Sequence, residues 1–144
     1  MSFIKIWVHC VWTTKKRIPY LGDIMRDSLI GHILENAKSK AIHIDHLNGF
    51  NEHLHALISL GGNQNISEIM QKLKGESSFW INKQKLTRLK FEWQDDYYAV
   101  SVGMNQIDSL RRYIRTQDQH HKKESFENEI DKLIEEYKLE RFRD

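Results

Sequence analysis

The stretch Glu52-His53-Leu54-His55-Ala56-Leu57-Ile58-Ser59-Leu60 alternates between two kinds of side chain along its length. Alternation with a period of two is typical of a β-strand that buries one face in a core. One side of this predicted strand is apolar and carries Leu54, Ala56, Ile58 and Leu60. The other side carries His53, His55 and Leu57. The strand therefore directs its apolar residues to a core and two histidines to the opposite face.

Outward from this strand, the same patterns predict three further strands and two long helices. The helices show apolar residues at helical spacing, and Asn65 with Glu68 is a typical helix start. In chain order the predicted elements are a strand over 3–13, a helix from 23, a strand over 41–47, the strand over 53–60, a helix from 66 and a strand over 97–102. This βαββαβ order predicts an α+β, ferredoxin-like (RRM-like) domain, in which two helices cover one face of an antiparallel sheet.

Two additional C-terminal helices are predicted after the last strand, at about residues 105–119 and 124–140. The face of the sheet that the first two helices leave open is their natural docking surface. His53 and His55 point toward that face, because the apolar positions of their strand are already assigned to the other side.

Composition indicates a soluble globular protein, and the chain of 144 residues is predicted to form one domain over 1–144. Hydrophobic residues make up 40% and charged residues 29%, which argues against a disordered chain. The lone Cys10 excludes an internal disulfide and suits a reducing compartment. Because no apolar run approaches ~18 residues and no signal-peptide pattern is present, we expect a cytoplasmic protein without a membrane span.

Charge is unevenly distributed, although the net charge is only +2. Basic residues cluster in the body of the chain, whereas much of the acid lies between Glu124 and Asp144. A basic body is compatible with a nucleic-acid partner. A solvated surface is the alternative explanation for any single cluster.

Two small groups of residues could carry chemistry. His53 and His55 project from the same side of a strand, so both imidazoles can reach one cation; two partly exposed histidines without a ligand are the alternative. Tyr113 and Gln117 are four residues apart and therefore share one face of a helix. A tyrosine in this position is either a packing residue or a phenolic nucleophile.

Several segments, in this order and at this spacing, resemble one known family. The segments are Trp12-Thr13-Thr14-Lys15-Lys16-Arg17, the histidine strand from Glu52 to Ile58, Leu73-Lys74-Gly75-Glu76-Ser77-Ser78, Trp93 with residues 97–103, and Tyr113-Ile114-Arg115-Thr116-Gln117. They resemble the HUH (His-hydrophobe-His) single-strand DNA transposases with one catalytic tyrosine, the transposase A proteins of the "IS two hundred" type of insertion sequence. One departure is Glu52, since the family usually has aspartate before the first histidine.

The resemblance implies that His53, His55 and Gln117 bind one Mg²⁺ or Mn²⁺ ion. It implies that Tyr113 attacks the scissile phosphate and forms a 5′-phosphotyrosine, after which a second DNA end rejoins the strand. The implied partner is single-stranded DNA that forms hairpins, and the implied assembly is a homodimer whose tyrosine helix docks on the partner. The candidate phosphate-binding residues are Lys15, Lys16, Arg17, Lys72, Lys74, Arg111 and Arg112, and the candidate base-stacking residues are Trp93, Tyr97 and Tyr98.

Two other functions stay open at this point. One is a catalytically silent module that binds single-stranded nucleic acid, derived from such a transposase. The other is a metal-dependent hydrolase whose histidines activate water. Of the remaining histidines, His9 is expected to be structural or to support the histidine pair, and His120-His121 are expected to cap a helix end.

Overall fold

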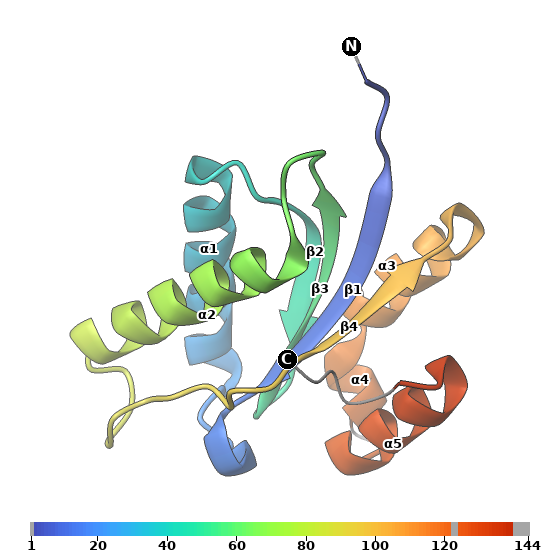
Figure 1. Ribbon diagram of the computed structural model, residues 1–144. Coiled ribbons are helices and arrows are strands. Elements are labelled where there is room, and N and C mark those ends of the chain that lie inside the picture. Colours follow the sequence, from blue (N-terminus) through green and yellow to red (C-terminus); the bar gives the residue numbers. More distant parts are fainter. Residues whose placement is uncertain (1, 122–123, 140–144) are drawn as a thin grey trace.

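A computed structural model of the chain describes residues 2–121 and 124–139. The predicted domain over 1–144 extends beyond the described residues at position 1 and at 140–144. The predicted last helix over 124–140 extends beyond them at position 140. Four strands form one sheet in the order β2-β3-β1-β4 (Figure 1), and every neighbouring pair is antiparallel. The strands are β1 (Ile6–Thr13), β2 (His43–Gly49), β3 (His53–Leu60) and β4 (Tyr98–Val102). The predicted α+β, ferredoxin-like fold is confirmed.

Helices α1 (Asp23–Ser39) and α2 (Ile66–Lys83) cover one face of the sheet (Figure 1). The Asn65 side chain accepts a hydrogen bond from the Glu68 backbone N–H at 2.9 Å, which caps α2 as the sequence predicted. The strands contribute alternate residues to the core beneath these helices: Val8, Cys10, Trp12, Leu54, Ala56 and Ile58. The period-two pattern therefore identified the core face correctly.

The second face is covered by a short 3₁₀ turn (Met104–Gln106) and by helices α3 (Ile107–Arg115), α4 (Gln117–His121) and α5 (Phe126–Tyr137). Ile107 and Ile114 pack against Trp7 and Leu57, and α5 packs against Val11. These contacts confirm that the C-terminal helices dock on the face to which the histidines point. None of the helices in the described residues is long and apolar enough to cross a bilayer.

The predicted helix over 105–119 is interrupted at Thr116. Its backbone angles, φ −107° and ψ 26°, leave the helical region, and its hydroxyl donates to the Arg112 carbonyl at 2.9 Å. Strand β2 also begins two residues later than predicted. Ala41 has a positive φ of 57° and closes the end of α1, where the Ile42 N–H donates to the Ala37 carbonyl at 2.9 Å.

Candidate active site

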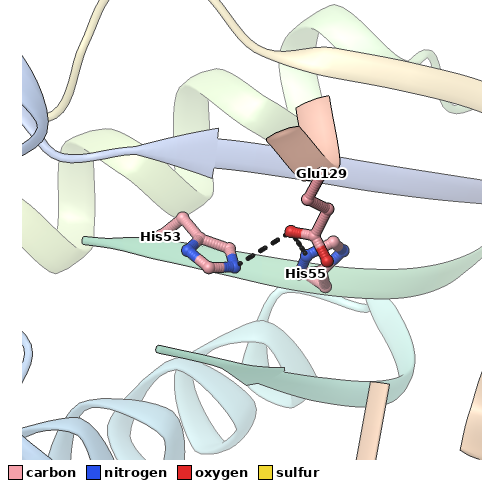
Figure 2. Close-up of side chains that lie close together, drawn as sticks. All are labelled: His53, His55 and Glu129. Atoms are coloured by element: carbon pink, nitrogen blue, oxygen red, sulfur yellow. Dashed lines mark hydrogen bonds and ion pairs between the residues drawn. The ribbon is translucent and has the colours of Figure 1, made fainter. Parts of the chain in front are cut away.

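His53 and His55 lie side by side on the second face of β3 and are completely buried. Their ring centroids are 5.0 Å apart. The strand places both rings on this face, and α3, α4 and α5 exclude solvent from them. Figure 2 shows the two rings directed toward the carboxylate of Glu129. The alternative of two partly exposed histidines does not fit this burial.

Gln117 and Tyr113 approach the same point from α4 and α3 of the same chain. The Gln117 side-chain oxygen lies 3.0 Å from His53 Nε2, and Gln117 is fully buried. The Tyr113 ring lies 5.6 Å from the His55 ring, edge to face, and its hydroxyl donates a hydrogen bond to Glu129. The structure thus brings together all four residues that the sequence singled out for chemistry.

Glu129 is the central residue that sequence reasoning missed. It extends from α5, is 2% exposed, and its Oε1 lies 3.1 Å from His55 Nε2 and 3.4 Å from His53 Nε2 (Figure 2). Its other oxygen, Oε2, accepts hydrogen bonds from the Tyr113 hydroxyl and from the Gln117 amide. A signal was present, because Glu129 lies within the apolar stripe formed by Phe126 and Ile130.

His120 and His121 turn into the site, so the predicted capping role does not describe them. His121 Nε2 lies 3.1 Å from the Gln117 side-chain oxygen and 3.2 Å from Glu129 Oε1. His120 Nε2 lies 2.9 Å from the Glu124 carboxylate. On the other side of the pair, His9 Nε2 lies 2.9 Å from His55 Nδ1, which makes His9 a support for His55.

Glu52, the departure from the family pattern, keeps the contact expected of a carboxylate in this position. One of its oxygens lies 2.7 Å from His53 Nδ1. The hydrogen bond from His53 helps to hold the pKa of Glu52 below its usual range, although burial acts in the opposite direction. The longer glutamate side chain therefore still orients the imidazole ring.

Burial determines the charge state of the site. It lowers the pKa of His55 to about 4 and that of His9 to about 3, so both rings are neutral near pH 7. For Glu129, burial opposes ionisation, but hydrogen bonds from His121 and His55 outweigh it and hold the pKa well below its usual value. Burial and the neighbouring charge of Glu129 raise the pKa of Tyr113. The site thus combines a carboxylate, neutral rings at His9 and His55, and a protonated phenol.

The chemistry of these donors fits a divalent cation. One nitrogen each of His53 and His55 and one oxygen of Glu129 all lie within 4.8 Å of one another. The Gln117 side-chain oxygen adds a fourth donor beside His53. Neutral imidazoles offer lone pairs, and the carboxylate supplies the negative charge that a buried cation requires.

The family model described as "Transposase IS200 like" matches residues 2–117 of the chain. The chain belongs to this family. Transposases catalyse DNA transfer, so membership defines the chain as a DNA-transfer enzyme by family. The match ends at Gln117 and leaves His120, His121 and Glu129 outside the matched residues.

Two solved structures share the fold of this transposase. A protein of Deinococcus radiodurans R1 assigned as a transposase has a TM-score of 0.66 and 21% identity, and the alignment covers 81% of this chain and 93% of that one. A REP-associated tyrosine transposase bound to a REP hairpin has a TM-score of 0.64 and 15% identity, with 84% of this chain and 72% of that one covered. No curated protein sequence matches the chain.

The predicted DNA-contacting residues of the transposase lie in different places. Lys15, Lys16 and Arg17 form a 3₁₀ turn directly after β1. The Arg17 guanidinium lies 5.2 Å over the Phe126 ring, which stacks on His53 at 4.1 Å between centroids. This turn therefore borders the site, and Lys15 also pairs with Glu92 at 3.4 Å.

The other basic residues that were predicted to bind phosphate lie farther from the histidines or already have partners. Lys72 is exposed on α2, and Lys74 on the same helix donates to the carbonyls of Gln94 and Asp95 at 2.6 and 2.8 Å. Arg111 makes a two-pronged ion pair with Asp45, at 2.8 and 2.9 Å, whereas Arg112 is exposed. Lys72 and Lys74 thus belong to a helix on the opposite face of the sheet from the histidines.

Three residues were predicted to stack on bases, and for Trp93 this prediction is wrong. It is 6% exposed within the core beneath α2, and its indole N–H donates to the Ser77 hydroxyl at 2.9 Å. Tyr97 and Tyr98 are half-buried and keep part of their rings accessible. Base stacking by these two tyrosines stays a prediction.

Proposed function

We propose that this transposase nicks and rejoins single-stranded DNA through a covalent 5′-phosphotyrosine at Tyr113. The observation that carries the proposal is the contact between the Tyr113 hydroxyl and Glu129, which is itself hydrogen-bonded to His55. A phenol, two imidazoles and an amide oxygen converge within one chain. Membership of a transposase family supports the assignment of this site to DNA strand transfer.

In the proposed reaction, the Tyr113 oxygen forms a bond to phosphorus and the bond from phosphorus to the 3′-oxygen breaks. The phenol proton leaves along the hydrogen bond to Glu129, and the departing strand ends as a free 3′-hydroxyl, so one proton passes overall from phenol to leaving strand. The phosphotyrosine keeps the phosphodiester linkage. A second 3′-hydroxyl can therefore reverse the step and join new ends without water.

His53, His55 and Gln117 would hold Mg²⁺ or Mn²⁺, with Glu129 within reach of the same point. When bound, the ion supplies Lewis-acid polarisation of the scissile phosphate. The protein's own contribution is orientation, because Glu52 fixes His53 and His9 fixes His55. Tyr113 is half-buried, which limits the access of water to the phenol.

The proposed partner is single-stranded DNA that forms a hairpin. Support comes from the family, from the REP hairpin held by the REP-associated relative, and from the basic turn of Lys15, Lys16 and Arg17 beside the site. The homodimer that the resemblance implies stays a prediction. One chain brings Tyr113 to its own histidine pair, so the proposed site does not require a partner's tyrosine.

The test uses a labelled, hairpin-containing single-stranded oligonucleotide with Mn²⁺, followed by a denaturing gel. We expect a covalent protein–DNA adduct that Tyr113→Phe abolishes, because phenylalanine lacks the attacking oxygen. Tyr137→Phe is the matched control, since Tyr137 lies at the exposed end of α5 and should form adduct at the normal level.

The same gel separates the alternatives. If cleavage gives no adduct and persists in Tyr113→Phe, the nucleophile is water and the protein is a metal-dependent hydrolase. Binding across varied oligonucleotides, with neither cleavage nor adduct, would indicate a catalytically silent binding module. Either result would overturn the proposed strand-transfer function.

A further inference from the structure

We propose that His121 and Glu129 are two further ligands of the metal ion, and that His121 makes the site selective for a divalent transition-metal ion over Mg²⁺. The inference rests on the proposed function in one respect, because it assumes that His53, His55 and Gln117 hold a metal. It goes beyond that function by assigning ligands from α4 and α5 and by predicting which ions the protein binds.

The first observation is the convergence of five donor atoms. Glu129 Oε1 lies 3.4 Å from His53 Nε2, 3.1 Å from His55 Nε2 and 3.2 Å from His121 Nε2. The Gln117 side-chain oxygen lies 3.0 Å from the same nitrogen of His53 and 3.1 Å from that of His121. Glu129 Oε1 thus lies within 3.4 Å of three ring nitrogens, and the Gln117 oxygen lies within 3.1 Å of two of them.

The second observation is that the outer nitrogen of each ring is already engaged. His53 Nδ1 lies 2.7 Å from a Glu52 oxygen, and His121 Nδ1 lies 2.9 Å from the Glu124 carbonyl. A carboxylate and a carbonyl only accept hydrogen bonds, so these outer nitrogens carry the proton. With the proton on the outer nitrogen, the inner nitrogen of His53 and of His121 is the atom with which each ring can bind a metal ion. For His55, the outer nitrogen lies 2.9 Å from Nε2 of His9.

The third observation is the orientation of the oxygens. The Gln117 amide nitrogen donates to Glu129 Oε2 at 3.3 Å, which turns the Gln117 oxygen toward His53 and His121. Lone pairs on nitrogen then face lone pairs on oxygen in a buried place. Such a set is satisfied by a cation at its centre, or by an extra proton on each of these rings. A divalent ion bound beside Glu129 and Gln117 would satisfy these facing donors without extra protons.

The donor set also predicts the class of ion. Mg²⁺ prefers oxygen ligands and keeps several of its waters, whereas imidazole nitrogen suits transition-metal ions. With His121 the site offers three imidazoles, compared with two in the set that the resemblance implies. Glu129 adds the negative charge that offsets a divalent ion in a buried site. His121 therefore favours ions such as Mn²⁺ and Co²⁺ over Mg²⁺, whereas Glu129 strengthens the binding of both kinds of ion.

The test measures Mn²⁺ binding to the full-length protein by calorimetry, without DNA, and then displacement of Mn²⁺ by Mg²⁺. We expect His121→Gln and Glu129→Gln each to weaken Mn²⁺ binding by at least about tenfold. His121→Gln replaces a nitrogen donor by an oxygen donor, so Mg²⁺ should displace Mn²⁺ from it more readily. Matched controls are His43→Gln and Glu127→Gln, which change an exposed histidine on β2 and an exposed glutamate on α5.

A second readout is the visible absorption of Co²⁺, which depends on the number and kind of its ligands. The spectrum should change in His121→Gln and Glu129→Gln but not in the controls. Far-ultraviolet circular dichroism identifies any variant that has not folded, and the ratio of Mg²⁺ to Mn²⁺ affinity is compared only among folded proteins.

The outcomes separate this inference from the proposed function. If Mn²⁺ binds, His53→Ala removes it, and His121→Gln and Glu129→Gln bind with unchanged affinity, spectrum and selectivity, the inference is overturned while the metal site of the proposed function stands. If the wild-type protein binds no Mn²⁺, both are overturned. If the two variants weaken binding and shift selectivity as stated, the inference is supported.

Discussion

The two faces of the sheet are built from alternate residues of the same strands, yet they differ in the polar side chains that they bury. On β3, Leu54 enters the apolar core beneath α1 and α2, and its neighbours His53 and His55 enter the site beneath α3, α4 and α5. On β1, Cys10 and His9 divide in the same way. Apolar packing holds the first face together, whereas on the second face the apolar contacts of α3 and α5 surround a cluster of paired polar groups.

This difference indicates which face evolved for chemistry. A buried polar group costs about 1–3 kcal/mol when its partner is missing, so an apolar side chain is the simpler filler for a core. The second face nevertheless buries His9, His53, His55, Gln117 and Glu129. Stability alone does not call for such a set, and each member has a partner among the others.

The largest expected effect separates the faces by activity. We predict that replacing both His53 and His55 by alanine lowers adduct formation by at least about a thousandfold, because metal polarisation is worth several kcal/mol. Oligonucleotide binding should largely persist, since we expect the phosphate contacts to come from the basic residues. The gel assay and a filter-binding measurement check the two parts. An equal loss of binding would assign the histidines to DNA contact or to structure.

Leu54, the residue between these histidines, should behave in the opposite way. Leu54→Ala leaves a cavity in the apolar core and should lower the free energy of unfolding by about 3 kcal/mol, measured by urea denaturation. The folded fraction should form adduct at the normal rate. Ile24→Ala is the control, because Ile24 is 85% exposed on α1. If Leu54→Ala abolished adduct formation in folded protein, the two faces would not be separable.

Much of this arrangement was predictable because it follows local rules. The alternation in β3 depends only on the strand period, and the start of α2 depends on Asn65 and Glu68, which are neighbours in sequence. The end of α1 was less visible, because Ala41 adopts a positive φ without the glycine that usually marks such a turn. The interruption of the helix at Thr116 was also not predictable, because no glycine or proline lies there.

The site was predictable only where a motif carried it. His53, His55, Tyr113 and Gln117 stand in short patterns that the family shares. Glu129 belongs to a helix with many exposed acids, and its role arises from the docking of α5 on the sheet, which sequence spacing does not specify. Trp93 shows the converse, because a motif position with an aromatic residue lies within the core.

The next expected effect concerns a polar pair on the apolar face. The buried Ser77 hydroxyl donates to the Leu73 carbonyl at 2.6 Å and accepts from the Trp93 indole at 2.9 Å. We predict that Ser77→Ala lowers the free energy of unfolding by about 1–2 kcal/mol, because the buried indole N–H loses its partner. Ser78→Ala, one residue along and only half-buried, should change it little. Urea denaturation measures both, and equal effects would remove the indole contact as the cause.

The smallest expected effect lies at the rim of the second face, where Asp45 on β2 holds Arg111 on α3. The hydrogen bond from Arg111 lowers the pKa of Asp45 below its ordinary value of 3.8, against the opposing effect of burial. A carboxyl group whose pKa is lower in the folded state stabilises the fold above its unfolded pKa, and this contribution is lost as the pH falls through the folded pKa.

Asp45→Asn should therefore be slightly less stable than the wild-type protein near pH 7, and the difference should shrink as the pH falls below about 4. Exposed ion pairs contribute little, so the effect should be smaller than that of Ser77→Ala. Urea denaturation of both proteins at about pH 7 and pH 3 measures the difference. A constant difference would mean that Asp45 acts through packing rather than charge. The contact between Asp45 and Arg111 would then stabilise the fold by packing, as the side chains of the apolar face do.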